Sequence, residues 1–76
     1  MTEGEYMLLE VGDELSHPQF KAYTFTVSEI EENHDRVYAR VLHKGEQRVA
    51  NERYELRNAG VSGFVVVSSK REELWE

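Results

Sequence analysis

The stretch YTFTVSEIEENHDRVYARVLH, residues 23–43, decides the fold of this chain. Residues 23–27 alternate aromatic or aliphatic side chains with threonines, and residues 37–41 alternate small apolar side chains with polar or aromatic ones. A period of two is typical of strands that bury one face. Between the two halves lies Glu32-Asn33-His34-Asp35, whose residue types favour a turn. The stretch therefore predicts a β-hairpin.

The register of this hairpin requires one irregularity. If Ile30 faces Val37, simple antiparallel counting places Val27 on the wrong face, opposite Arg40. A β-bulge at Ser28-Glu29 inserts one extra residue and returns every apolar side chain to one face. The pairs that result are Ile30 with Val37, Val27 with Ala39, Phe25 with Val41 and Tyr23 with His43. Because bulges bend and twist a strand, the pattern favours a barrel over a flat sheet.

Length and composition limit the class of protein. A chain of 76 residues is expected to form one domain over residues 1–76, since it is too short to build two cores. It has no cysteine and a net charge of -6, which excludes a disulfide framework and opposes nonspecific attraction to nucleic acid or anionic lipid. No apolar run approaches the roughly 20 residues that span a bilayer. We expect a soluble cytoplasmic protein without membrane contact.

Two further segments have strand-like patterns. Residues 6–11 predict a first strand with Met7, Leu9 and Val11 on one face. Residues 64–67 form an uninterrupted apolar run. Such a run is typical of a strand that is covered on both faces, so we expect it to be the last strand of the core.

The segment before the last strand combines the signals of a short helix. Residues 47–50 could form a short strand, but Asn51 is a favourable N-cap and Gly60 can take the left-handed position after a helix. The sequence therefore predicts one short helix near residues 52–59. Residues 68–76 are expected to form a flexible or short helical tail.

This order of elements resembles small SH3-like β-barrels. The residues that carry the resemblance are Val11-Gly12-Asp13, the loop at His17-Pro18, the strands at residues 25–30 and 37–41, and a helical turn near residues 54–56. The resemblance covers most of residues 6–67 and implies a mainly-β fold, an antiparallel barrel of about five strands. Many proteins of this fold are binding modules with unrelated partners, so the resemblance concerns the fold and not the activity.

A stripe of polar side chains is the first candidate site. Arg36, Tyr38 and Arg40 alternate on one strand and share a face, which suits base stacking combined with phosphate contact. The candidate binding residues are Arg36, Tyr38, Arg40, Arg48 and Arg53. The alternative is an ordinary solvated face, because Glu29 and Glu31 lie opposite this stripe in the hairpin and can form cross-strand ion pairs.

A possible partner patch combines both ends of the chain. Tyr6 and Leu8 belong to the predicted first strand, and Leu74 and Trp75 lie near the C-terminus. Tyrosine and tryptophan are enriched at binding hot spots, so these four side chains could meet a partner protein. The alternative, which we favour, is that they cover one another within the chain.

Signals of catalysis are absent from the sequence. There is no glycine-rich phosphate loop, nucleophile elbow or metalloprotease motif. His17, His34 and His43 are not spaced like a metal site. We therefore expect no enzyme activity, no cofactor and no metal.

The sequence as a whole favours a non-enzymatic binding module or regulatory adaptor whose partner is a protein. We expect it to be a monomer or a weak dimer. The main alternative is nucleic-acid binding through the face of Arg36, Tyr38 and Arg40. A second alternative is an acidic mimic of DNA that inhibits a DNA-binding protein.

Overall fold

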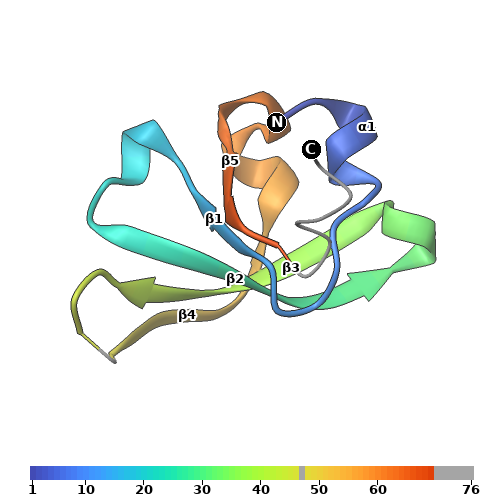
Figure 1. The fold of residues 1–76 in the computed structure, drawn as a ribbon. Helices are drawn as coiled ribbons and strands as arrows, with labels where there is room; N and C mark the ends of the chain where they lie inside the picture. Colours follow the sequence, from blue (N-terminus) through green and yellow to red (C-terminus); the bar gives the residue numbers. More distant parts are fainter. Residues whose placement is uncertain (47, 70–76) are drawn as a thin grey trace.

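The chain folds around one antiparallel sheet of five strands, which confirms the predicted mainly-β class (Figure 1). The computed structural model describes residues 1–46 and 48–69. The strands are β1 (Glu14–Ser16), β2 (Tyr23–Glu31), β3 (Arg36–His43), β4 (Val49–Glu55) and β5 (Val65–Ser68). The helical elements are α1 (Glu3–Tyr6) and the 3-10 turns η1 (Pro18–Phe20), η2 (Glu32–His34), η3 (Leu56–Ala59) and η4 (Val61–Gly63).

The predicted hairpin and its bulge are both confirmed. β2 and β3 pair with Phe25 opposite Val41 and with Val27 opposite Ala39. The register then shifts between Val27 and Glu29, so that Glu29 faces Tyr38. The turn at η2 is left-handed, because Glu32, Asn33 and His34 all have positive φ, at 50°, 55° and 73°. The Nε2 atom of His34 lies 2.9 Å from the carbonyl oxygen of Leu9 and ties this turn to the segment before β1.

The strand order leaves the sheet with two edges. It runs β4-β3-β2-β1-β5, and β1 pairs with both β2 and β5. Within residues 1–46 and 48–69, no pairing joins β4 to β5. The described strands therefore form a curled five-stranded sheet, and they do not show the closed barrel of the sequence-based prediction.

The predicted first strand at residues 6–11 is wrong. Residues 3–6 form the short helix α1, whose N-terminus has a capping box between Thr2 and Glu5. The Thr2 side chain accepts from the Glu5 N–H at 3.1 Å, and the Glu5 carboxylate accepts from the Thr2 N–H at 2.9 Å. This local cap satisfies two backbone donors and favours a helical turn. The first strand, β1, begins only at Glu14.

The predicted helix near residues 52–59 is only partly correct. Residues 49–55 belong to β4, and the helical part is the single 3-10 turn η3. Pairing with β3 sets Tyr54 opposite Ala39 in the sheet, and such tertiary contacts outweigh the weak propensity of a two-turn helix. The Asn51 side chain accepts from the Arg53 N–H at 2.9 Å, which is a local bond within a strand and not a helix cap.

The last strand is not covered on both faces as predicted. Phe64 is fully buried just before β5, but Val65 and Val67 are 56% and 61% exposed. Val66 between them packs against the core, so Val65 and Val67 lie on the opposite face of β5. Of the predicted tail at residues 68–76, Ser68 ends β5 and residues 70–76 lie outside the described residues.

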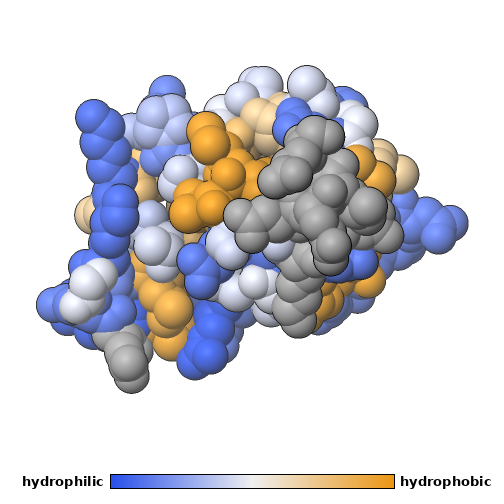
Figure 2. Space-filling model, in the orientation of Figure 1, coloured by the Kyte–Doolittle hydropathy of each residue, from blue (hydrophilic) through white to orange (hydrophobic). Residues whose placement is uncertain are grey.

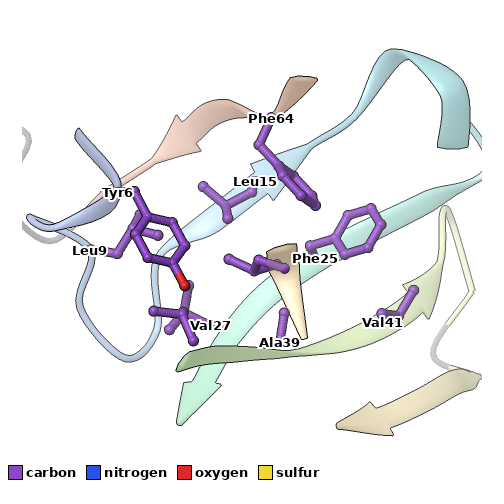
Figure 3. Packing of buried hydrophobic residues seen from close by; sticks show 10 residues of the cluster. Tyr6, Leu9, Leu15, Phe25, Val27, Ala39, Val41 and Phe64 are labelled. Carbon is purple, nitrogen blue, oxygen red and sulfur yellow. The ribbon is translucent and has the colours of Figure 1, made fainter. Parts of the chain in front are cut away.

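The core lies between the β2–β3 hairpin and the pair formed by β1 and β5 (Figure 3). Its buried members are Tyr6, Leu9, Leu15, Phe25, Val27, Val37, Ala39, Val41, Leu56 and Phe64. Phe25 and Phe64 meet edge to face, with ring centroids 5.1 Å apart. Aromatic pairs of this geometry stabilise beyond their buried area.

One histidine is built into this core. The His17 ring is 5% exposed and packs edge-on against Phe64 with centroids 4.9 Å apart. Its Nδ1 accepts from the Gln19 N–H at 3.2 Å, and its Nε2 lies 3.1 Å from the Ala59 carbonyl oxygen. Since Nδ1 is an acceptor, the ring proton sits on Nε2 and is donated to Ala59. His17 therefore holds η1, η3 and the start of β5 together.

Candidate functional site

The arginine–tyrosine stripe predicted from the sequence lies on β3, but its aromatic plane is covered. The Arg53 guanidinium on β4 lies 3.8 Å from the centroid of the Tyr38 ring. The same guanidinium contacts Glu29 at 2.9 Å and Glu31 at 3.3 Å. Tyr38 is only 8% exposed. A base that stacked on this ring would have to displace Arg53 from both carboxylates.

Electrostatic shifts in this cluster follow from the same contacts. The hydrogen bond from Arg53 lowers the pKa of Glu29, whereas the nearby Glu29 raises the pKa of Glu31. A hydrogen bond with Tyr38 raises the pKa of Arg36. These groups thus form one network of charged and polar side chains across β2, β3 and β4.

The remaining candidate arginines also have carboxylate partners. Arg40 lies 3.4 Å from Glu52, and Arg48 lies 3.4 Å from Glu46. All four side chains are more than half exposed, so each pair contributes at most about 1 kcal/mol. The arrangement corresponds to the solvated, ion-paired alternative for this face.

The described residues of the predicted partner patch do not lie together on the surface. Tyr6 is fully buried, and the Arg57 guanidinium lies 4.4 Å from its ring centroid. Burial raises the pKa of the Tyr6 phenol. Leu8 is 45% exposed, while Leu74 and Trp75 lie outside the described residues. Tyr6 therefore belongs to the core, and the described residues bring no aromatic side chain of this set to the surface.

An aromatic groove that the sequence did not predict lies between η1, β2 and β4. It has a volume of about 180 Å³, and its lining includes Phe20, Tyr23, Phe25, Val41, Asn51 and Tyr54. Phe25 and Val41 are buried and form the floor, whereas Phe20, Tyr23 and Tyr54 are half-buried and form the walls. We call this surface the aromatic groove.

Ring contacts hold the walls of the aromatic groove in place. Phe20 and Tyr54 each contact Phe25, with centroids 6.3 Å and 6.0 Å apart. Phe20 also contacts the buried His17 at 5.1 Å, and Tyr23 contacts His43 at 5.0 Å. The groove is therefore preformed, since its rings are positioned by packing within the chain.

A second hollow adjoins the aromatic groove. It has a volume of about 210 Å³ and shares Phe20 and Tyr23 with the groove. Lys21 and Lys44 line it from two segments that are joined by a hydrogen bond of 2.8 Å, from the Lys44 N–H to the Ala22 carbonyl oxygen. We call it the lysine hollow.

A further hollow lies along the edge strand β5. It has a volume of about 330 Å³, and its lining includes Met1, Glu5 and residues 64–69. Figure 2 shows apolar side chains gathered on the face of the molecule over β5, where Val65 and Val67 are exposed. Among the described residues that line this hollow, the buried Phe64 is the only aromatic one.

The sequence contained part of the signal for the aromatic groove. The period of the hairpin already turns Tyr23 and Phe25 to one face. The sequence did not predict the position of Tyr54, because a helix near residues 52–59 would have kept this residue out of the sheet. Only the pairing of β4 with β3, which sets Tyr54 opposite Ala39, brings the Tyr54 ring beside Phe25.

In the part of the chain that the structure describes, no three His, Asp or Glu side chains gather as metal ligands would. None of the helices formed by residues 1–46 and 48–69 has the length and apolar character needed to cross a membrane.

Comparison with known proteins gives no relative for this chain. No protein-family model matches it, and no curated protein or solved structure shows significant similarity to it. The function therefore has to be argued from the geometry of its own surfaces.

Proposed function

We propose that this chain is a non-enzymatic binding module that holds a short segment of another protein in the aromatic groove. The observation that carries the proposal is the set of half-buried rings of Phe20, Tyr23 and Tyr54 around a buried floor. Aromatic side chains at a concave surface supply large contact area at little cost in conformational entropy. An apolar side chain of the partner segment would fill the groove.

The groove suits a peptide better than a small metabolite. Its volume of about 180 Å³ is below the roughly 300 to 1,000 Å³ of typical small-molecule sites. One large apolar side chain can fill such a space, while the rest of the peptide lies on the neighbouring surface. Binding through one anchor side chain is a common form of peptide recognition.

Nucleic-acid binding has less support. The stacking surface of Tyr38 is covered by Arg53, and both Arg53 and Arg40 are ion-paired. A net charge of -6 adds long-range repulsion of phosphates. We therefore favour a protein partner.

The proposal is tested by selecting peptides from a displayed library of random short peptides on the full chain. Selected peptides are then measured against Ala50→Trp, in which a large side chain is added to the exposed lining of the groove. We expect this variant to weaken binding by more than about tenfold, because an interface hot spot is typically worth at least about 2 kcal/mol. Binding is measured by fluorescence polarisation.

The control variant is Asn58→Trp, which adds the same side chain at an exposed position of η3 away from the groove. It should bind the selected peptides like the original chain. If no peptide is enriched, or if Ala50→Trp binds the peptides as tightly as Asn58→Trp does, the groove is not the binding site and the proposal fails.

A further inference from the structure

We infer that the aromatic groove takes an acidic peptide segment, with one apolar side chain in the groove and neighbouring carboxylates over the lysine hollow. This inference rests on the proposed function and specifies the chemistry of the ligand. Three features support it: two lysines that have no ion pair among the described residues, the continuity of the two hollows, and the distribution of charge on the rest of the molecule.

The two lysines of the hollow differ from four of the arginines, which have carboxylate partners. Arg40, Arg48, Arg53 and Arg57 each lie within 3.4 Å of a carboxylate oxygen. Lys21 and Lys44 are exposed, and neither has an ion pair within the described ranges 1–46 and 48–69. The chain has 15 acidic and nine basic residues, so carboxylates are in excess, yet none of those in the described residues pairs with Lys21 or Lys44.

The lysine hollow and the aromatic groove form one continuous surface. Phe20 and Tyr23 line both, so the two rings form the ridge between them. The backbone bond from Lys44 to Ala22 keeps the ends of β3 and the η1 loop together. Lys21 and Lys44 are thereby held at one side of the ridge. A peptide that crosses the ridge would place adjacent residues in the two hollows.

This charge distribution selects a peptide with one or two carboxylates over a polyphosphate. The lysine ammonium groups act on charges nearby, since interactions at exposed sites are screened beyond about 10 Å at 0.1 M salt. A nucleic acid carries a charge at every nucleotide and would meet the carboxylates elsewhere on the acidic surface. A short acidic segment lies only over the two lysines, so it meets their positive potential and avoids the carboxylates elsewhere.

The test uses a matched series of synthetic peptides on the full chain. All share an apolar core taken from a groove-binding peptide, and the flanking residues are aspartate, asparagine or lysine. Cation–carboxylate contacts at exposed sites are individually weak, so the aspartate peptide should bind about three- to tenfold more tightly than the asparagine peptide. The lysine peptide should bind most weakly, and added salt should reduce the differences.

Charge variants of the chain test whether the preference for the aspartate peptide arises at the lysine hollow. Lys21→Gln combined with Lys44→Gln should abolish the preference for aspartate while the asparagine peptide still binds. The matched control is Asn58→Asp combined with Ser62→Asp, which changes the net charge equally at exposed positions of η3 and η4. This control should keep the preference, because its new charges lie outside both hollows.

The possible contrary results distinguish a failure of this inference from a failure of the proposed function. If the three peptides bind equally, or if the preference persists in the Lys21 and Lys44 variant, the inference is overturned while the proposed function stands. If none of the peptides binds, both fail. A single-stranded oligonucleotide is measured in parallel, and tight binding that is lost in the Lys21 and Lys44 variant would assign the surface to nucleic acid instead.

Discussion

At the scale of single residues, the contact between His17 and Gly63 sets a strict limit on side-chain size. A Cβ atom on Gly63 would come within 2.9 Å of the Cε1 atom of His17 and would overlap Nε2. Since the ring is fixed by Gln19, Ala59 and Phe64, it cannot move aside. Gly63→Ala is therefore expected to lower the free energy of unfolding by about 1 to 3 kcal/mol, measured by urea denaturation.

A double-mutant cycle separates this clash from backbone effects. In a His17→Ala background the ring is absent, so Gly63→Ala should cost almost nothing there. His17→Ala itself is destabilising, because it leaves the Gln19 N–H without its acceptor and opens a cavity. An equal cost of Gly63→Ala in both backgrounds would show that the imidazole is not what requires glycine.

At the scale of elements, the left-handed turn η2 is a source of strain. Glu32 has no special ability to adopt positive φ, whereas Asn33 between Glu32 and His34 tolerates it. Glycine at position 32 removes the steric cost of about 1 to 2 kcal/mol but makes the unfolded chain more flexible. We expect Glu32→Gly to raise the free energy of unfolding by about 0.5 to 1 kcal/mol.

The control for this prediction is Glu52→Gly on β4, where the backbone does not have positive φ. Glycine within a strand is destabilising, so the two substitutions should change the urea midpoint in opposite directions. A lower midpoint for Glu32→Gly would mean that the turn does not require left-handed residues.

The capping box of α1 gives a prediction about proton binding. The backbone N–H of Thr2 bonds to the Glu5 carboxylate and lowers the pKa of that group. This hydrogen bond stabilises the fold fully above the ordinary pKa of a glutamate, and the stabilisation is lost as the pH falls through the lowered pKa of Glu5. In an NMR titration, Thr2→Pro should raise the pKa of Glu5, because proline has no N–H.

Thr2→Ala is the matched variant, since it removes only the hydroxyl and keeps the N–H. It should raise the Glu5 pKa less than Thr2→Pro does. If both variants titrate like the original chain, the capping box does not form in solution.

The elements also show which parts of the fold the sequence could predict. The β2–β3 hairpin and its bulge were predictable because alternation, turn residues and register constrain each other within 21 neighbouring residues. β4 was not, because Asn51 and Gly60 favour helix ends locally and only the pairing of Tyr54 with Ala39 outweighs them. The aromatic groove depends on that pairing, so it was missed with it. The lysine hollow was missed because Lys21 and Lys44 are far apart in the chain.

The arginine–tyrosine stripe could also be predicted only in part from the sequence. The period of two predicts its position on the outer face of β3, and cross-strand ion pairs with Glu29 and Glu31 are the predicted alternative to binding. The cover of Tyr38 by Arg53 was not predictable, because Arg53 reaches the ring only from a neighbouring strand.

At the scale of the whole molecule, stability depends on the contact between the last strand and the hairpin. Phe64 precedes β5 and packs on Phe25 of β2 (Figure 3). It also packs on His17 before η1. A small domain has a net stability of only about 5 to 10 kcal/mol. Loss of this one ring removes contacts from three separate parts of the chain at once.

Phe64→Ala is therefore expected to cost about 3 to 5 kcal/mol, enough to leave much of the protein unfolded on mild heating. Val67→Ala, three residues later in the same region, should change stability by less than about 0.5 kcal/mol, because Val67 is 61% exposed. Thermal unfolding followed by circular dichroism compares the two. If Val67→Ala proves as damaging as Phe64→Ala, then β5 is stabilised through its outer face, and that face is buried against another surface in solution.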